Sequence, residues 1–385
     1  MLRFTAIRYA DAADLELIED IERAADIRFA TLSAARGISY DEWPGPGASA
    51  AERASGPGFL LVAGQPAVGF AHVLDVGGHL VLEQLSVRPE VGRLGLGTAL
   101  LRAAMGVAMD AGHDLLLLRT FAEVAWNGPF YAGHGFTEVP DPTWLAPLIA
   151  AEERDGLSRW GRRITMARPL RDEPLPRPAV SVIPLRDGAA GLEAFVQYRV
   201  GTMDFAANAV VFPGGRIDAA DRLARVDVSD ELLREHVSAW RATDVGSVAD
   251  DAVSAARTLL ATGLREVREE AAAELDPSRL VPWDNWVTPI GVPKRFDVYF
   301  FIVPVSAGEE ASWRHTTTEA HDSRWIRVAD LAAVTDRGEA LLLPPTRAIV
   351  DELASLGDLA SVLALRPVIR PVRHDLDVRR PRPSR

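Results

Sequence analysis

The sequence contains no cysteine among its 385 residues. Disulfide bonds, thiol nucleophiles, thiolate zinc sites and iron–sulfur clusters are therefore excluded. Only one of the 42 lysine and arginine residues is a lysine, Lys294, so Schiff-base chemistry on a protein amine has almost no candidates. No apolar run reaches the roughly 18 residues that a membrane span requires. Chemistry based on carboxylates, hydroxyls, backbone amides and bound metal ions remains.

The net charge is −12, yet residues 366–385 hold seven arginines and only two aspartates. Because nucleic-acid binders usually show a basic domain rather than a basic tail, we expect small-molecule substrates and no nucleic acid or membrane partner. The first residues turn acidic at once, unlike a secretory signal. These features predict a cytoplasmic protein and leave its oligomeric state open.

The length favours two or three domains at about 100–200 residues each. Residues 168–178 read RPLRDEPLPRP, and proline-rich chain of this kind is extended and semi-rigid, as in a linker. Strand and helix patterns follow one another on both sides, which predicts the α/β class with α+β character. The expected parts are a first domain at 1–168, a linker at 169–178, a second domain at 179–365 and a disordered basic tail at 366–385.

A strand, a glycine-rich turn and a helix are predicted in residues 82–105, LEQLSVRPEVGRLGLGTALLRAAM. The turn contains Gly92, Gly95 and Gly97, and the helix is expected to begin near Thr98. Glycines at a helix start let backbone N–H groups approach a phosphate, and the helix dipole adds about half a positive charge there. A structural strand–turn–helix uses the same glycines, so this segment alone leaves both interpretations open.

Residues 126–136, WNGPFYAGHGF, follow that helix. Together the two segments resemble the GNAT family of acyl-CoA-dependent N-acyltransferases, which carry a Q/R-x-x-G-x-G/A loop and a later segment with Asn, Phe-Tyr and Gly-Phe. The resemblance covers about residues 1–170 and implies a mixed sheet with flanking helices. Gly92 stands where the family usually has Gln or Arg, and Arg93 follows it.

The resemblance implies acetyl-CoA as co-substrate. The backbone amides that would hold its pyrophosphate belong to Leu94, Gly95, Leu96, Gly97 and Thr98. The strand with Leu85 and Val87 would leave its neighbour and pair with the pantetheine arm, beside Asn127.

Two side chains receive chemical roles from the same resemblance. Tyr131 would protonate the departing thiolate, and its alternative is a core aromatic that packs on Phe136. Glu83 would deprotonate the acceptor amine, directly or through water, and its alternative is a solvated or structurally paired carboxylate. His79 and His134 are expected at the surface or in structural roles.

A second constellation lies in residues 263–275, GLREVREEAAAEL. On a helix, Glu266, Glu269 and Glu270 share one face. Three crowded carboxylates repel one another unless a cation compensates, and hard divalent ions prefer such oxygens. The alternative is a solvated acidic face.

With residues 209–223, AVVFPGGRIDAADRL, this helix resembles the Nudix hydrolases, whose box is G-x5-E-x7-R-E-U-x-E-E-x-G-U, U being aliphatic. Gly215 begins the motif, Asp221 takes the place of the first Glu, and residues 265–270 match R-E-U-x-E-E. The spacer 222–264 has 43 residues instead of seven, with a helical stretch expected near residues 230–241, and is expected to be an excursion from the loop. Ala272 replaces the usual Gly, which we expect to be conservative.

Two further runs, 211–218 and 288–301, resemble the branch of the peroxisomal coenzyme A diphosphatase. The resemblance covers about residues 178–365 and implies an α/β/α sandwich that uses Mg²⁺ or Mn²⁺. Its implied ligands are Glu266 and Glu270, with the Gly215 carbonyl, while Glu269 completes the cluster or orients the attacking water. The metal would lower the pKa of water and neutralise the diphosphate oxygens.

Other residues of the second domain have open assignments. Arg265 is expected to pair with carboxylates of the motif. Glu319 is either a late catalytic acid or an exposed loop carboxylate. Lys294 and Arg295 either touch an anionic substrate or form a salt bridge at the sheet edge.

The sequence therefore predicts a bifunctional enzyme, an N-acetyltransferase fused to a metal-dependent hydrolase of a substrate linked to a nucleoside diphosphate, with CoA or acyl-CoA as a candidate. The alternative is one active Nudix hydrolase regulated by a CoA-sensing GNAT-like domain, because Gly92 and Asp221 depart from the family patterns. The acceptor amine depends on residues 37–58 and 144–160, which carry no recognised motif.

Overall fold

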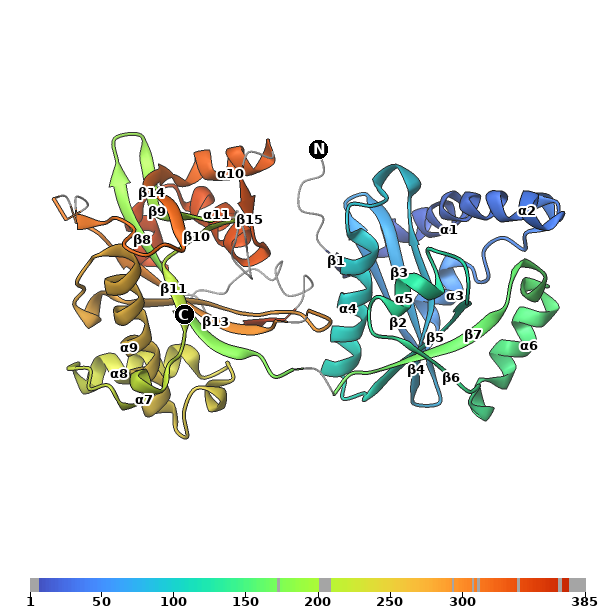
Figure 1. Cartoon of the computed structure of the whole chain (residues 1–385), viewed down its shortest axis with the longest axis horizontal. Coiled ribbons are helices and arrows are strands. Elements are labelled where there is room, and N and C mark those ends of the chain that lie inside the picture. The colour runs from blue at the N-terminus through green and yellow to red at the C-terminus, as the bar shows by residue number, and fades with distance from the viewer. Residues whose placement is uncertain are drawn as a thin grey trace.

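The chain forms two α/β units, each built on its own mixed sheet, which confirms the predicted fold class (Figure 1). The computed structural model describes residues 7–171, 174–200, 209–292, 294–306, 308–309, 312–337, 340–365 and 369–373. The disordered tail expected at 366–385 lies almost wholly outside these ranges.

The first sheet has the strand order β1-β2-β3-β4-β5-β7-β6. Its strands are β1 (Ile7–Tyr9), β2 (Gly58–Gly64), β3 (Ala67–Val76), β4 (His79–Val87), β5 (Leu115–Phe121), β6 (Thr137–Val139) and β7 (Arg163–Pro169). Only β4 and β5 pair in parallel along this order. Parallel neighbours need a crossover connection, and α4 (Leu96–Asp110) provides it.

Helices cover both faces of the first sheet, because successive strand residues point to opposite sides. Leu61 and Val73 pack with α4 on one face. Val62 and Phe70 pack with α1 on the other. The remaining helices of this unit are α1 (Ala12–Asp26), α2 (Ala30–Arg36), α3 (Ala50–Ser55), α5 (Gly128–Ala132) and α6 (Ala146–Arg154).

The second sheet has the order β15-β10-β9-β8-β13-β12-β16, with β11 beside β8 and β14 beside β9. Its strands are β8 (Arg177–Gly188), β9 (Gly191–Arg199), β10 (Ala209–Val211), β11 (Gly214–Arg216), β12 (Val281–Val287), β13 (Phe296–Pro304), β14 (Ala320–Arg327), β15 (Leu341–Leu342) and β16 (Pro371–Val372). The helices are α7 (Ala219–Leu223), α8 (Asp230–Trp240), α9 (Ala252–Ala271), α10 (Val328–Asp336), α11 (Pro344–Leu356) and α12 (Leu359–Ala364).

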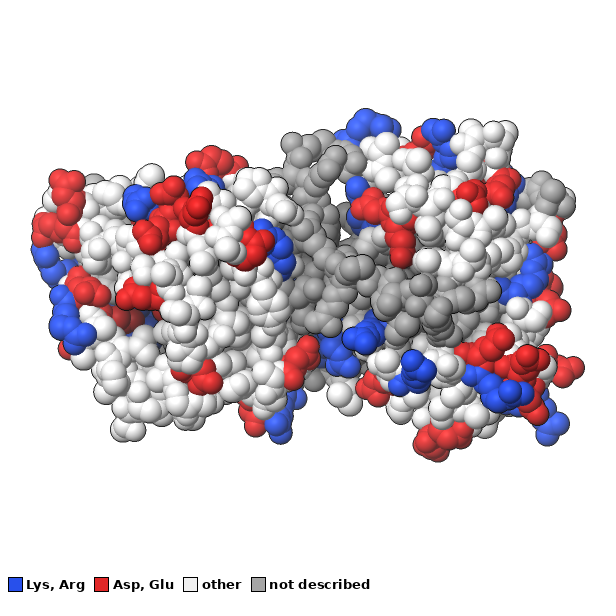
Figure 2. Space-filling view, turned by 180° about the vertical axis from the view of Figure 1, so that it is seen from behind, with Lys and Arg blue, Asp and Glu red and all other residues white. Residues whose placement is uncertain are grey.

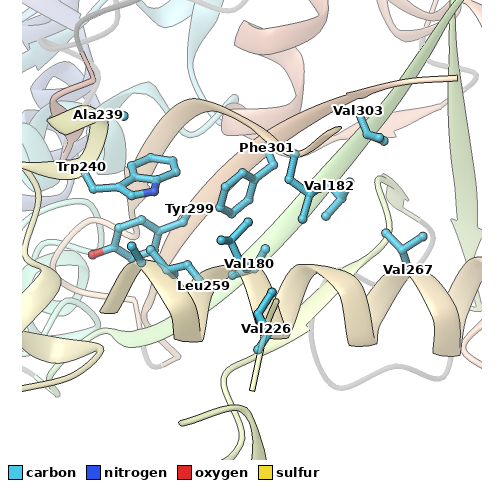
Figure 3. Packing of buried hydrophobic residues seen from close by; sticks show 14 of the residues in the cluster. Val180, Val182, Val226, Ala239, Trp240, Leu259, Val267, Tyr299, Phe301 and Val303 are labelled. Carbon is cyan, nitrogen blue, oxygen red and sulfur yellow. The ribbon is translucent and has the colours of Figure 1, made fainter. Parts of the chain in front are cut away.

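The second unit is layered as an α/β/α sandwich. Tyr299 and Phe301 of β13 face α8 and α9, and the alternate residues Phe300 and Ile302 face α11 and α12. Figure 3 shows the first of these layers, with the β13 rings set between the strands and helix α9.

The helical stretch predicted near residues 230–241 is confirmed as α8, but the expectation that residues 222–264 are an excursion from the loop is wrong. They include α8 and more than half of α9, and their apolar residues Leu233, Trp240 and Leu259 lie in the core. The Trp240 ring meets Tyr299 and Phe301 edge-on at centroid distances of 5.2 and 5.3 Å (Figure 3). The reason is that amphipathic helices bury their apolar face against the sheet. The insertion is therefore part of the fold of the second unit.

The chain leaves the first sheet at Pro169 and enters the second at Arg177. The hairpin between β12 and β13 reaches back to the first unit (Figure 1). Ile290 at its tip is 2% exposed and lies in the core cluster that includes Met105 of α4. The Arg102 guanidinium, also on α4, lies 3.5 Å from the Gly291 carbonyl oxygen. One apolar residue of the second unit thus completes the core of the first.

None of the described helices has both the length and the apolar character that a membrane crossing requires. On the face shown in Figure 2, acidic and basic side chains of the described residues are intermingled.

Candidate active sites

The glycine turn places an uncapped helix start next to β4. Gly95 precedes α4 with a φ of +83°, a conformation in which a Cβ is strained, and no side chain caps the helix. The first intrahelical acceptor here is the Gly95 carbonyl, bonded by Ala99 N–H at 2.9 Å. The N–H groups of Leu96, Gly97 and Thr98 therefore lack an intrahelical partner. Helix α4 begins at Leu96, two residues before the expected Thr98. The predicted amides of residues 94–98 therefore lie in the glycine-rich turn and in the first turn of α4.

β4 and β5 pair only briefly before they separate. The register joins Leu80, Val81 and Leu82 to residues 116–118 and extends no further among the described pairs. A bulge in β4 falls at Glu83, because His72 pairs with Gln84 while Val73 pairs with Leu82. Beyond the bulge, Leu85 and Val87 pair with β3 on their other side. Their edge toward β5 is thus placed to receive an extended ligand, as predicted.

Helix α5 brings Asn127 and Tyr131 beside the start of α4. The His134 ring links the two helices, with Nε2 3.1 Å from the Thr98 hydroxyl and Nδ1 2.8 Å from the Phe130 carbonyl oxygen. His134 therefore has a structural role, as expected. Asn127 stands at the N-cap position of α5 but makes no side-chain capping bond, and its Oδ1 is buried without a hydrogen-bond partner among the described residues. An orphaned buried acceptor of this kind needs a donor from water or a ligand.

Tyr131 has the surroundings of the core aromatic that the sequence offered as one interpretation, and its role as a general acid stays a prediction. Its ring packs edge-on against Phe130 and Phe136, and the residue is 8% exposed. Burial raises the pKa of the phenol well above its usual range, and the opposing charge of Arg163 does not offset this. The hydroxyl is therefore protonated at neutral pH, which is the form that a general acid requires.

Glu83 is held in a buried ionic network that the sequence did not reveal. Arg53 from α3 donates to it through Nε at 3.2 Å and Nη2 at 3.3 Å, and His72 Nδ1 lies 2.9 Å away. Burial favours a higher pKa for Glu83, but the hydrogen bonds and charges of His72 and Arg53 outweigh it and lower the pKa. Arg53 also donates to Glu22 of α1 at 2.5 and 3.1 Å. The paired-carboxylate interpretation of Glu83 thus describes its surroundings.

Residues 37–58 and 144–160, the two segments expected to shape the acceptor site, meet in one aromatic cluster. Trp43 stacks on Phe29 at 4.2 Å and meets Trp160 edge-on at 5.0 Å. The indole N–H of Trp43 donates to Asp26 Oδ2 at 2.9 Å. Phe121, at the end of β5, belongs to the same cluster. No sequence motif predicts this assembly, because its members come from four distant segments.

Arg265 is the centre of the second site. It donates to both oxygens of Asp221 at 2.9 and 2.8 Å, to Glu266 at 2.7 Å and to Glu269 at 3.0 Å. Asp221 is only 4% exposed and also accepts from the Thr262 hydroxyl. Asp221 therefore holds Arg265 in place as a partner within the motif. The Asp221 side chain is shorter than the glutamate that the motif usually has here, yet it reaches the Arg265 guanidinium.

Glu266 and Glu270 lie against β11. Gly214 N–H donates to Glu270 Oε2 at 3.0 Å. A Cβ at Gly215 would lie 2.3 Å from Glu266 Oε1, so only glycine allows this approach. Burial raises the pKa of Glu270 to about 7, with Glu266 and Glu319 adding repulsion, and it also raises the pKa of Glu266. Glu266 thus has Arg265 as its cationic partner, whereas the hydrogen bond that Glu270 accepts comes from a neutral backbone N–H.

Glu269 is not brought together with them. Its half-exposed side chain turns to Arg265. Within the described ranges, no three His, Asp or Glu side chains converge closely enough to hold a metal ion. Glu319 pairs with Arg199 at 2.9 Å and lies near enough to Glu270 to raise its pKa.

One expectation about the flanking residues is wrong, and the structure shows where another flanking residue lies. Ala272 adopts a left-handed φ of +56° at the end of α9, a position that favours glycine, so the exchange is not conservative. Arg295 is buried and donates to the carbonyl oxygens of Thr288 and Pro174, both at 3.1 Å. It secures the hairpin to the linker, and its contact with an anionic substrate stays a prediction.

The two units of the chain resemble different classes of known proteins. Residues 56–138 match the model of the Acetyltransferase (GNAT) domain. A Caenorhabditis elegans protein provisionally named nudix hydrolase 7 is 25% identical over 157 residues, which cover 37% of this chain and 50% of that protein. The chain thus spans about half the length of this curated relative.

Solved structures of both classes resemble parts of the chain. A NUDIX hydrolase from Alicyclobacillus acidocaldarius is 22% identical and has a TM-score of 0.40, with 50% of this chain and 97% of that one covered. The ribosomal-protein-S18-alanine N-acetyltransferase from Escherichia coli is 21% identical and has a TM-score of 0.28, with 43% and 94% covered. The family match and the curated relative support the prediction that the chain is an enzyme.

Proposed function

We propose that the chain is a bifunctional enzyme whose first domain is an acetyl-CoA-dependent N-acetyltransferase. The observation that carries this proposal is the separation of β4 from β5 beside an uncapped helix start, within the matched residues 56–138. The amides at 94–98 receive the pyrophosphate and the edge of Leu85 and Val87 receives the pantetheine arm. The orphaned Asn127 Oδ1 fits a donor on that arm.

Tyr131 has the role of general acid in this proposal. Its protonated hydroxyl donates to the sulfur as the carbon–sulfur bond breaks. We expect Tyr131→Phe to lower kcat about 10²–10⁴-fold without weakening acetyl-CoA binding. The assay follows release of the CoA thiol with a panel of aliphatic, aromatic, amino-acid and peptide amines, and Tyr9→Phe, an exposed tyrosine, is the matched control. Unchanged turnover in Tyr131→Phe would show that this residue only packs.

We propose that the second domain is a hydrolase of substrates linked to a nucleoside diphosphate, dependent on Mg²⁺ or Mn²⁺, of the coenzyme A diphosphatase branch. The donor set fits a hard cation, since the buried Glu266 and the partly buried Glu270, whose pKa is raised to about 7, lie together beside a glycine backbone. Glu266, Glu270 and the Gly215 carbonyl would hold the ion, and Glu269 would join after leaving Arg265. The ion would supply charge for the diphosphate oxygens and an acidic water.

The test of the second activity uses the full chain with Mg²⁺ and CoA. Mass spectrometry should detect 3′,5′-ADP, and Glu270→Gln should abolish it while Glu274→Gln, just beyond the helix, retains it. No product from CoA or acyl-CoA refutes this substrate assignment, and ADP-ribose and NADH then test the hydrolase class. If Mg²⁺ binds, it raises the melting temperature of the native protein but not that of Glu270→Gln.

A second candidate function is an active hydrolase with a CoA-sensing first domain. The contact of Ile290 with the core around α4 favours it, because this contact connects the two domains. Acetyl-CoA that alters hydrolase turnover in Tyr131→Phe would support this alternative. We further propose small-molecule substrates for both sites, a cytoplasmic location, and domain limits of 1–168 and 179–365.

A further inference from the structure

His72 of β3 has a free ring nitrogen and a fixed orientation. The residue is 2% exposed, and its Nδ1 lies 2.9 Å from Glu83 Oε2. Its Nε2 is buried without a hydrogen-bond partner among the described residues. Buried ring nitrogens normally find a partner, so this one requires an explanation.

The partner of Nδ1 fixes the tautomer. Glu83 is ionised, since Arg53 donates to both of its oxygens, and a carboxylate can only accept hydrogen bonds. The hydrogen therefore resides on Nδ1, and in the neutral ring Nε2 carries the lone pair. This is the arrangement by which a carboxylate orients a histidine base in hydrolases.

Glu83 itself is poorly suited to accept a proton. Both oxygens already take donors from Arg53 or His72, and these interactions stabilise the ionised form. General bases work best when their pKa lies near the operating pH, and a carboxylate with a lowered pKa is far from it. Glu83 of β4 receives the His72 ring nitrogen beside Arg53 of α3, which Glu83 shares with Glu22 of α1.

We propose that His72 is the residue that accepts the proton of the acceptor amine, and that Glu83 is its positioning residue. The inference rests on the proposed acetyltransferase function. His72 Nε2 takes the proton, directly or through one water, as the acceptor nitrogen bonds to the acyl carbon. Tyr131 donates a proton to the sulfur as the carbon–sulfur bond breaks, and the two side chains then return to their starting states by exchange with solvent.

The positions of His72 and Tyr131 agree with their proposed roles as base and acid. His72 and the bulged Glu83 lie where β4 leaves β5, and the Cβ position of Gly47 is 3.6 Å from Glu83 Oε1. Phe70, two residues before His72 and so on the same face, packs with α1. Tyr131 belongs to the cluster on the α4 face. The acid and the base thus approach the strand opening from opposite faces of the sheet.

The kinetic test uses the full chain, acetyl-CoA and the best amine of the panel. We expect His72→Gln to lower kcat/KM about 10²–10⁴-fold with unchanged acetyl-CoA affinity, and to remove the acidic limb of the pH profile. Glu83→Gln should retain a displaced acidic limb. His79→Gln, an exposed histidine, is the control. A His72→Gln enzyme within threefold of wild type, or loss of the limb only in Glu83→Gln, overturns the proposal.

A spectroscopic test is independent of turnover and of variant folding. Side-chain ¹⁵N resonances of the wild-type histidines should show His72 protonated at Nδ1 and bare at Nε2. The opposite tautomer overturns the proposal. A wild-type protein that binds acetyl-CoA but acetylates no amine refutes the acetyltransferase itself and with it the role of His72. If the wild type acetylates an amine and the His72→Gln variant does so at the same rate, only the role of His72 is refuted.

Discussion

His236 makes the second domain sensitive to acid. The ring lies on α8, is 1% exposed and is stacked on Phe301 at 5.8 Å. Burial lowers its pKa to about 4, and a bond to the Leu280 backbone does not offset this. The unfolded chain has a histidine pKa of about 6.5. Below that pH the unfolded state binds a proton that the folded state refuses, so stability is complete above pH 6.5 and falls as the pH drops toward 4.

The two pKa values give the magnitude. A difference of about 2.5 units corresponds to a full loss of about 3 kcal/mol, of which about 2 kcal/mol is lost between pH 7.5 and pH 5. Other groups titrate in this range, so the measured quantity is the difference between wild type and His236→Gln, whose amide still donates to Leu280.

Urea unfolding at both pH values provides the free energies, and hydrogen exchange on β13 peptides assigns the transition to the second domain. The wild type should lose about 2 kcal/mol more than His236→Gln over this interval. His79→Gln, an exposed histidine of the first domain, should behave like the wild type. Parallel pH profiles for wild type and His236→Gln would refute the account of a buried neutral ring.

Three further changes test the second domain by urea unfolding. Trp240→Ala should lower the free energy of unfolding by about 3–5 kcal/mol, because it leaves a cavity in the core. The partly exposed Trp144 serves as the control, and a smaller loss for Trp240→Ala than for Trp144→Ala would contradict this. Ala272→Gly should stabilise by about 1 kcal/mol, because φ is positive there, whereas Ala151→Gly inside α6 should destabilise by a similar amount. Arg265→Met should cost about 3–5 kcal/mol by leaving Asp221 buried and unpaired, and adding Asp221→Asn should recover part of it. Equal stability of Arg265→Met and wild type would show that the pair contributes nothing.

The sequence was informative where chemistry is local. The glycine turn before α4 and the carboxylate spacing of α9 follow from residues close in the chain, and both elements form as predicted. The pairing of Arg265 with carboxylates of its motif was also predictable, because Glu266 and Glu269 are close to it on one helix.

The remaining features depend on contacts between distant segments. His72 meets Glu83 only because a bulge shifts the register of β3 on β4. The sequence indicated a helix within the 43-residue insertion but not that the apolar residues of the insertion complete the core. Ala272 looked harmless by residue type, and only its backbone angle reveals the strain. Side-chain chemistry was readable, whereas register and backbone conformation were not.

The hairpin tip at Ile290 limits how this chain can be divided. A first-unit fragment that ends in the linker would expose to water the apolar surface beside Met105 that Ile290 covers. The complementary second-unit fragment would expose the Ile290 side chain, which is buried in the full chain. Such matching apolar surfaces lower solubility on both sides. The two units are therefore joined by a shared core residue as well as by a peptide bond, and proteolytic cutting between residues 170 and 176 need not release them from each other.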